Sequence, residues 1–225
     1  MKATSARNRL CVLAATLVFL CSACAGTRFL ADPMLEIRGE KGIELGVATS
    51  DGVVFLGRTA RSGEVLITAW FGDGPSPEEA VVEPLGGGLF TAETEIRLPS
   101  VPISFDTPKA GDEVTVLGRS GSVPWEESVR VLEDPRVVEG FLLPWIPRFE
   151  GHPELIGAGV FVVDLQDARL KRLVGLVSGK LELTGADGKS ATYLAVIGPS
   201  ELWRLPTSKR DNSKKHKSVY REDIL

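Results

Sequence analysis

The stretch Ile156-Gly-Ala-Gly-Val-Phe-Val-Val-Asp164 places two glycines around an alanine and continues into four apolar residues and an acid. Glycines gather where the backbone turns tightly or where another group must approach it closely. Taken alone, these residues are typical of a β-bulge at the entrance of a strand. The tip of this turn carries only a methyl group. The rest of the sequence indicates whether the turn has a functional role besides a structural one.

The overall composition is that of a folded protein with many turns. Hydrophobic residues make up 43% of the 225 residues and charged residues 25%, an ordinary balance for a globular chain. Glycine (24) and proline (14) recur throughout, as they do in all-β proteins. The length allows one large core or two small ones.

Short β-branched runs alternate with turns from Gly42 onward, and turn sequences such as Ser50-Asp-Gly separate them. This spacing predicts a sandwich or barrels, and no segment before residue 198 shows a helical period. Ser200 has the character of an N-cap for a short helix that ends at Leu205. The expected strands are 42–49, 53–58, 64–69, 89–96, 113–117, 128–132, 137–143, 159–165, 173–177, 181–184 and 192–197.

Charge is distributed unevenly along the chain. Residues 25–205 include 17 basic and 27 acidic side chains, a net charge of −10, which argues against a nucleic-acid-binding core. Residues 206–225 form a basic tail with a net charge of +3. We expect this tail to be disordered, and the alternative that it binds anionic lipid or polyanions stays open.

The N-terminus has the pattern of an export signal. Met1–Arg9 is positively charged, and Leu10–Ala23 is an apolar run that is too short to span a bilayer but suits the central region of a signal peptide. The three cysteines of the chain lie at positions 11, 21 and 24, so an exported body would have no internal disulfide.

The residues around Cys24 resemble the processing site of bacterial lipoproteins, in which the cysteine is diacylated and becomes the new N-terminus. Ser22 and Ala23 fit the small positions before it, whereas Cys21 departs from the usual leucine. The resemblance implies a signal peptide at 1–23, a tether at 24–36, and a lipid anchor on the periplasmic or cell-surface side of a bacterial membrane. Alternatively, Ala23-Cys-Ala25 is an ordinary cleavage site that releases a soluble protein.

Four segments between residues 64 and 200 follow one another in the order of a known protein family. They are Glu64–Phe71, Ala110–Gly118, Ala158–Asp164 with Leu173–Gly179, and Tyr193–Ser200. In this order they resemble the histidine strand, the last strand of the first barrel, the nucleophile loop with its following strand, and the terminal strand of trypsin-like serine proteases. The bacterial high-temperature-requirement branch is the most similar.

The resemblance implies an all-β fold of two six-stranded antiparallel β-barrels (a trypsin-like double barrel) with a short C-terminal helix. It covers residues 37–205, with the first barrel at about 37–118 and the second at about 128–198. The stretch Arg119–Trp125 is the expected link between the two halves.

The resemblance also implies that the catalytic residues are replaced. Phe71 stands at the histidine position, Ala158 at the serine position and Ile156 at the position of an oxyanion-loop glycine. Catalysis in this family needs a nucleophile, a base, an orienting acid and oxyanion donors. The two histidines, His152 and His216, both lie outside the half that would supply the base. We therefore interpret the domain as catalytically inactive.

Other chemistry finds little support in the sequence. Glu93 and Glu95 lie near the expected acid but are interpreted as solvent-facing strand residues, and His152 is the one candidate for rescue of a base. Motifs for nucleotide, metalloprotease or paired-cysteine chemistry are absent, so we expect no cofactor and no metal.

The sequence favours a binding or scaffolding module at the cell envelope. Its expected partners are a protein or an extended peptide, added to a strand edge, and the lipid bilayer through acylated Cys24, with no nucleic acid. Two alternatives stay open: a serine-type endopeptidase with an unorthodox site, and a surface lipoprotein whose basic tail binds anionic lipid or polyanions.

Overall fold

The structure is a computed structural model that describes residues 32–50, 52–71, 74–96, 99–104, 106–132, 140–152, 154–163, 171–185 and 188–199. The chain divides into two units, Met1–Asp32 and Pro33–Leu225, and every element below belongs to the second. The predicted lipidation site Cys24, the helix expected from Ser200 and the basic tail all lie outside the described residues. Within the described part of the chain, no helix has the length and hydrophobicity to cross a bilayer.

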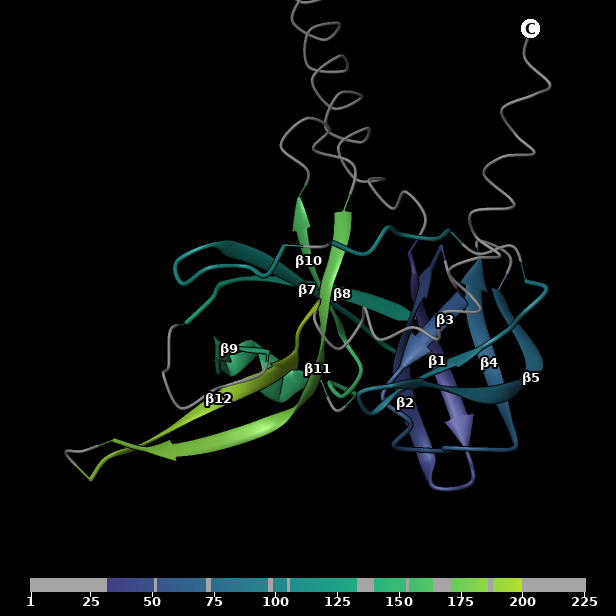
Figure 1. The fold of residues 1–225 in the computed structure, drawn as a ribbon, viewed down its shortest axis with the longest axis horizontal. Helices are drawn as coiled ribbons and strands as arrows, with labels where there is room; N and C mark the ends of the chain where they lie inside the picture. Colours follow the sequence, from purple (N-terminus) through teal and green to yellow (C-terminus); the bar gives the residue numbers. More distant parts are fainter. Residues whose placement is uncertain are drawn as a thin grey trace, which may run out of the picture. The chain divides into compact units, whose positions relative to one another are not determined.

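The first half of the body is a closed antiparallel barrel in which the strands follow the order β1-β2-β3-β6-β5-β4 (Figure 1). Alternating burial along a strand directs every second side chain to the barrel interior. In β4, for example, Val65, Ile67 and Ala69 are buried while the residues between them are more exposed. The strands are β1 (Met34–Gly39), β2 (Gly42–Thr49), β3 (Gly52–Phe55), β4 (Glu64–Phe71), β5 (Gly74–Gly86) and β6 (Leu89–Ala92).

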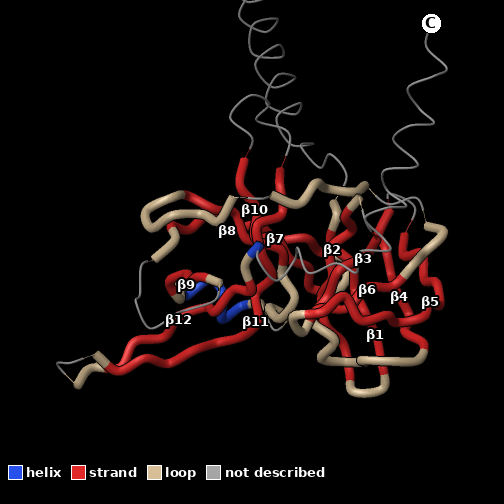
Figure 2. Tube along the Cα trace, viewed as in Figure 1, coloured by secondary structure: helices blue, strands red, loops and turns tan. Residues whose placement is uncertain are grey.

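The second half is a six-stranded antiparallel sheet in the order β8-β7-β10-β11-β12-β9 (Figure 2). An antiparallel bridge between Leu132 and Leu142 brings the β8 end of the sheet to β9 at the other end. A 3₁₀ turn, Pro147–Gly151, follows β9. The strands are β7 (Glu113–Ser120), β8 (Val123–Arg130), β9 (Phe141–Pro144), β10 (Gly159–Val163), β11 (Lys171–Thr184) and β12 (Ser190–Ile197).

The predicted all-β architecture is confirmed, but the boundary between the halves is wrong. We expected the strand at 113–117 to close the first barrel and residues 119–125 to link the halves. Instead β7 pairs with β10 in the second sheet, and residues 121–122 form the turn of the β7–β8 hairpin. β6 is the last strand of the first barrel along the chain, and the connection between the halves runs from residue 93 to residue 112.

Two strands of the first barrel were missed in the sequence. β1 begins at Met34, inside the segment expected to be a tether. β5 alternates between exposed and partly buried residues, but it contains Pro75 and Pro77, and proline in a strand ordinarily argues against pairing. Both prolines pair across to β4, opposite Trp70 and Thr68. The 3₁₀ turn was also not expected, because a single turn is too short to show a helical period.

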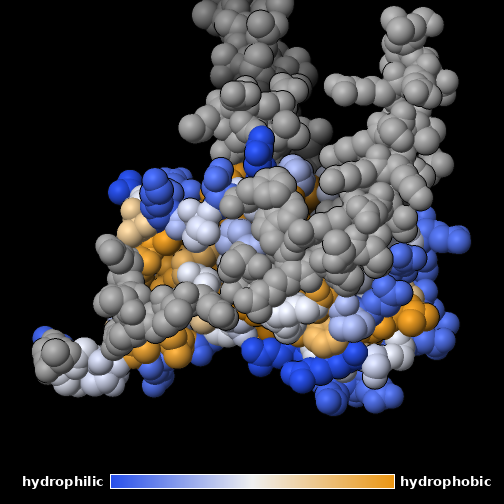
Figure 3. Space-filling model, viewed as in Figure 1, coloured by the Kyte–Doolittle hydropathy of each residue, from blue (hydrophilic) through white to orange (hydrophobic). Residues whose placement is uncertain are grey.

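The core that joins the two halves is a continuous apolar cluster. Leu45 and Val47 of β2 belong to the same cluster as Phe161 of β10 and Val177 of β11, and all four are buried. A separate cluster fills the inside of the first barrel. In the face shown in Figure 3, hydrophilic side chains outline the first barrel and apolar residues lie between them. Burial of the shared cluster therefore holds the halves in one compact unit.

We expect Phe161→Ala to lower the free energy of unfolding by about 3–5 kcal/mol, because the ring is fully buried in the shared cluster and its removal leaves a cavity. Urea denaturation measures the change. Val123→Ala is the matched control: this side chain is 62% exposed, and its removal should change stability by less than about 0.5 kcal/mol. Equal effects of the two substitutions would contradict a shared core at Phe161.

Candidate functional site at the seam between the two halves

The turn that precedes β10 directs its backbone amides into the protein. The Gly157 N–H donates to the Val177 carbonyl at 2.9 Å, and the Ala158 N–H donates to the Leu155 carbonyl at 3.1 Å. The Val177 N–H in turn donates to the Ala158 carbonyl at 2.9 Å. The Ala158 methyl group is fully buried, whereas the Ile156 side chain is 38% exposed. An oxyanion hole needs N–H groups that point at a substrate oxygen, and these two are already engaged.

The same turn packs directly on β2 of the first barrel. The Leu45 N–H donates to the Ile156 carbonyl at 3.1 Å. Gly157 has a φ of +84°, and a Cβ atom there would overlap the Leu45 carbonyl oxygen. Gly159 is restricted by side chains instead, because a Cβ atom there would overlap the Phe161 ring and crowd Val47. Glycine is needed on both sides of Ala158 because another backbone or side chain comes this close.

We call the contact between the first barrel and the second sheet, where the turn before β10 meets β2, the seam. A second contact across the seam comes from the turn after β3. The Arg58 guanidinium reaches β11, where Nη2 donates to the Ser178 carbonyl at 2.7 Å. Ser178 directly follows Val177, whose N–H is bonded to the turn of Ala158. The end of β3 and the turn before β10 therefore meet the same stretch of β11.

A buried carboxyl group fixes the turn that carries Arg58. Glu44 of β2 is 2% exposed, and its oxygens accept hydrogen bonds from the Leu56 N–H at 3.2 Å and the Thr59 N–H at 2.8 Å. The Thr59 hydroxyl donates a third bond at 2.9 Å. Burial raises the pKa of Glu44, and the hydrogen bonds from the turn oppose that rise. A buried acid with several donors is thus a structural support for this turn.

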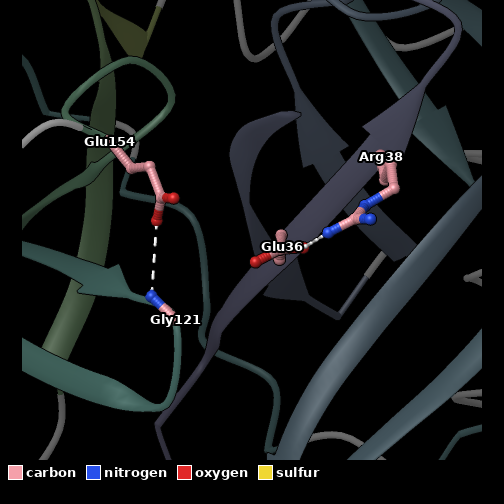
Figure 4. Close-up of polar contacts among 4 residues, drawn as sticks. All are labelled: Glu36, Arg38, Gly121 and Glu154. Atoms are coloured by element: carbon pink, nitrogen blue, oxygen red, sulfur yellow. Dashed lines mark hydrogen bonds and ion pairs between the residues drawn. The ribbon is translucent and has the colours of Figure 1, made fainter. Parts of the chain in front are cut away.

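Figure 4 shows two further polar contacts of the domain. Glu154, two residues before the exposed Ile156, accepts a hydrogen bond from the Gly121 N–H in the β7–β8 turn at 3.4 Å. On β1, Arg38 and Glu36 form an ion pair at 3.2 Å. The first of these contacts ties the segment that leads into the Ala158 turn to its own sheet.

Comparison with solved structures identifies known proteins with a similar fold. The structure resembles a serine protease of a human pathogenic astrovirus, with a TM-score of 0.52 and 13% sequence identity over 75% of this chain and 91% of the viral one. The chain has the trypsin-like double-barrel fold. Lower-scoring neighbours are the MamO protease domain from Magnetospirillum magneticum (TM-score 0.49, 17% identity, 75% and 94% of the two chains) and a serine endoprotease from Yersinia pestis (TM-score 0.49, 15% identity, 85% and 64%). No protein-family model matches the sequence, and no curated protein does either.

Within this trypsin-like fold, Phe71 ends strand β4 of the first barrel, whereas Ala158 lies in the turn before β10 of the second sheet. Phe71 is 40% exposed at the end of β4, a strand that pairs with β1 and β5. Figure 1 shows β4 and β10 apart, with β2 and β3 between them in this view. The neighbouring Trp70 meets the second sheet elsewhere, with the Arg119 guanidinium 5.4 Å from its ring centre. The segment that reaches the seam is the turn around Arg58, which the sequence did not single out.

The structure also shows the surroundings of His152, Glu93 and Glu95, the other residues considered for catalysis. His152 stacks on Trp125, with ring centres 4.1 Å apart, so its ring is engaged within the second sheet. Glu93 and Glu95 are exposed as expected, but they follow β6, which ends at Ala92, and so do not lie in a strand. They line a groove of about 640 Å³ on the first barrel together with four other glutamates. Among the described residues, no group of three or more histidine, cysteine or acidic side chains is arranged to hold a metal ion.

We expect Gly157→Ala to destabilise the protein by roughly 3–5 kcal/mol, because the new Cβ adds overlap with the Leu45 carbonyl to an unfavourable positive φ. Gly188→Ala is the matched control. Gly188 has a φ of +76° with open space around it, so only the backbone cost of about 1–2 kcal/mol applies. Denaturant unfolding of both variants measures the difference, and similar losses would contradict the close packing of the turn on β2.

Glu44 predicts a pH-dependent stability. Its pKa in the folded protein lies above its ordinary value of 4.5, so the folded state holds the proton more tightly than the unfolded chain. This contribution is fully present below the ordinary pKa and is lost as the pH rises through the folded pKa. The free energy of unfolding of the wild type minus that of Glu44→Gln should therefore fall as the pH rises above the ordinary pKa of 4.5.

Urea denaturation at each pH measures this difference. Glu79→Gln is the control, because Glu79 is exposed on β5. A difference between wild type and Glu44→Gln that stays constant with pH would contradict the raised pKa of Glu44.

Proposed function

We propose that this protein is a catalytically inactive trypsin-like domain that serves as a binding or scaffolding module at the cell envelope. The observation that carries the proposal is the state of the turn before β10. Its tip is the fully buried Ala158 methyl group, and the Gly157 and Ala158 amides are bonded within the protein. A substrate carbonyl would find no nucleophile at this turn, and the Gly157 and Ala158 amides would not be free to bind its oxygen.

The rest of the seam supports inactivity. The turn that faces β11 consists of Leu56, Gly57, Arg58 and Thr59, and none of these side chains can take a proton from a nucleophile near neutral pH. Arginine remains protonated in proteins, so Arg58 cannot act as the base. Loss of the nucleophile and base together lowers rate by about six decades in serine proteases, a loss of roughly 8 kcal/mol in transition-state stabilisation. The alternative of a working endopeptidase thus has no support at this seam.

The proposed binding surface is the free edge of β11. β11 pairs with β10 from Lys171 as far as Leu176, and it continues beside β12 to Thr184. From Ser178 to Thr184, no strand of the described residues covers the edge that faces away from β12, and Figure 1 shows this part as an arm extending from the sheet. An extended peptide can add to such an edge through backbone hydrogen bonds, with its side chains supplying specificity.

We further propose that acylated Cys24 anchors the domain to a bacterial membrane on its periplasmic or cell-surface side. This part rests on the sequence alone, because the positive and apolar segments before Cys24 have the order and length of an export signal. A lipid on the N-terminus would hold the peptide-binding edge near the membrane and raise its local concentration there.

We expect the purified protein to remain unlabelled by a fluorophosphonate probe and to cleave none of a mixed peptide library. Ala158→Ser should also stay unlabelled, because position 158 is fully buried and its neighbouring amides are engaged. In-gel fluorescence with trypsin as the positive control reads out labelling. Labelling of either protein would overturn the inactive assignment.

Lipidation predicts a specific chemical signature. Cells that express the full chain and are fed an alkyne fatty acid should incorporate it into the protein, and Cys24→Ser should remove that label because no thiol remains to be acylated. Cys21→Ser is the control and should keep the label. Equal labelling of wild type and Cys24→Ser would exclude Cys24 as the anchor.

A further inference from the structure

Arg58 is an exposed cation that reaches across the seam and makes one side-chain hydrogen bond to the described residues. Its Nη2 bonds to a neutral carbonyl, that of Ser178, at 2.7 Å. Among the described residues no carboxylate pairs with it, whereas Arg38 pairs with Glu36 at 3.2 Å and Arg148 with Glu127 at 3.1 Å. A guanidinium presents several N–H groups in a planar fork, so one bond to a carbonyl leaves donors available.

The position of this cation is fixed before any ligand arrives. The Glu44 carboxyl accepts hydrogen bonds from the backbone N–H groups of Leu56 and Thr59, on either side of Arg58. The carboxyl is buried and bonded to the turn backbone and to the Thr59 hydroxyl. A donor held in place by a buried support loses less entropy on binding than a free surface arginine.

Arg58 lies where the free edge of β11 begins. Its partner Ser178 is the residue at which the proposed peptide-binding edge starts, and the exposed Lys180 follows on the same strand. The Lys180 Nζ lies 4.2 Å from the ring centre of Trp145. Two cations therefore accompany the first residues of the edge, although residues 25–205 as a whole carry a net charge of −10.

We propose that Arg58 makes this edge selective for extended peptides that carry a carboxylate, which the guanidinium would bind beside Ser178. Charge-assisted bonds between guanidinium and carboxylate are shorter and stronger than neutral ones, and Arg can form two in parallel. The inference rests on the proposed function, because it assumes that a peptide adds to β11. It goes further by naming the chemistry of the partner and the residue that selects it.

The test uses the full chain and three fluorescent, threonine- and valine-rich extended peptides with blocked N-termini. Two have amidated C-termini and carry either Glu or Gln at the centre. The third carries Gln at the centre and has a free C-terminal carboxylate. We expect the Glu peptide to bind wild type at least tenfold more tightly than the Gln peptide, by fluorescence anisotropy. The third peptide separates an internal acidic side chain from a chain terminus as the source of the carboxylate.

Three variants assign the effect to Arg58. Arg58→Ala should reduce the preference for Glu over Gln to less than twofold, and Arg58→Lys should retain part of it because the charge remains without the planar fork. Arg38→Ala is the control and should keep the full preference, since Arg38 lies on β1 and pairs with Glu36. Unfolding midpoints show whether each variant is folded, and the comparison of peptides on wild type does not depend on any variant.

The outcomes separate the inference from the proposed function. If wild type binds the carboxylate peptides and the neutral peptide equally well, the inference fails while the peptide-binding edge stands. If Arg58→Ala keeps the preference, another cation is responsible and the assignment to Arg58 is wrong. If none of the three peptides binds at millimolar concentration, both the inference and peptide addition to β11 are contradicted.

Discussion

The structure depends on the close approach of the turn before β10 to β2. At this point one backbone runs against another: the Leu45 N–H bonds to the Ile156 carbonyl, and Gly157 has no room for a side chain next to the Leu45 carbonyl. Backbone groups buried at such a contact must pair, and here they do. The apolar cluster that contains Leu45 and Phe161 packs around this backbone contact. Together they fix the position of one half against the other.

The candidate site follows from this contact. Once the turn of Ala158 is fixed on β2, β11 is fixed beside it through Val177, and its next residue, Ser178, comes within reach of Arg58. Glu44 belongs to the same strand as Leu45, so β2 both positions the turn of Ala158 and supports the turn of Arg58. One strand of the first barrel thus organises both sides of the seam.

The sequence predicted the parts of this arrangement that depend on local chemistry. The glycines around Ala158 indicated a tight turn before a buried strand, and the alternation in β4 and β12 indicated strands. Errors arose where the answer depends on pairing between distant residues. The Leu-Ile-Thr-Ala stretch of β4 is similar to a histidine strand, but only the closure of the barrel shows that the turn after the short β3 faces β11. Nor does any local signal show that β7 pairs with β10.

The buried methyl group of Ala158 has a consequence for how the domain can evolve. Reactive centres commonly retain strained backbone and unsatisfied polar groups at a cost in stability. The turn of Ala158 is instead part of the core, with the Gly157 and Ala158 amides paired and the Ala158 methyl group buried, so it adds to stability. Buried residues such as Ala158 are then constrained by packing and by hydrogen bonding, whereas exposed residues such as Ile156 can change with less effect on stability.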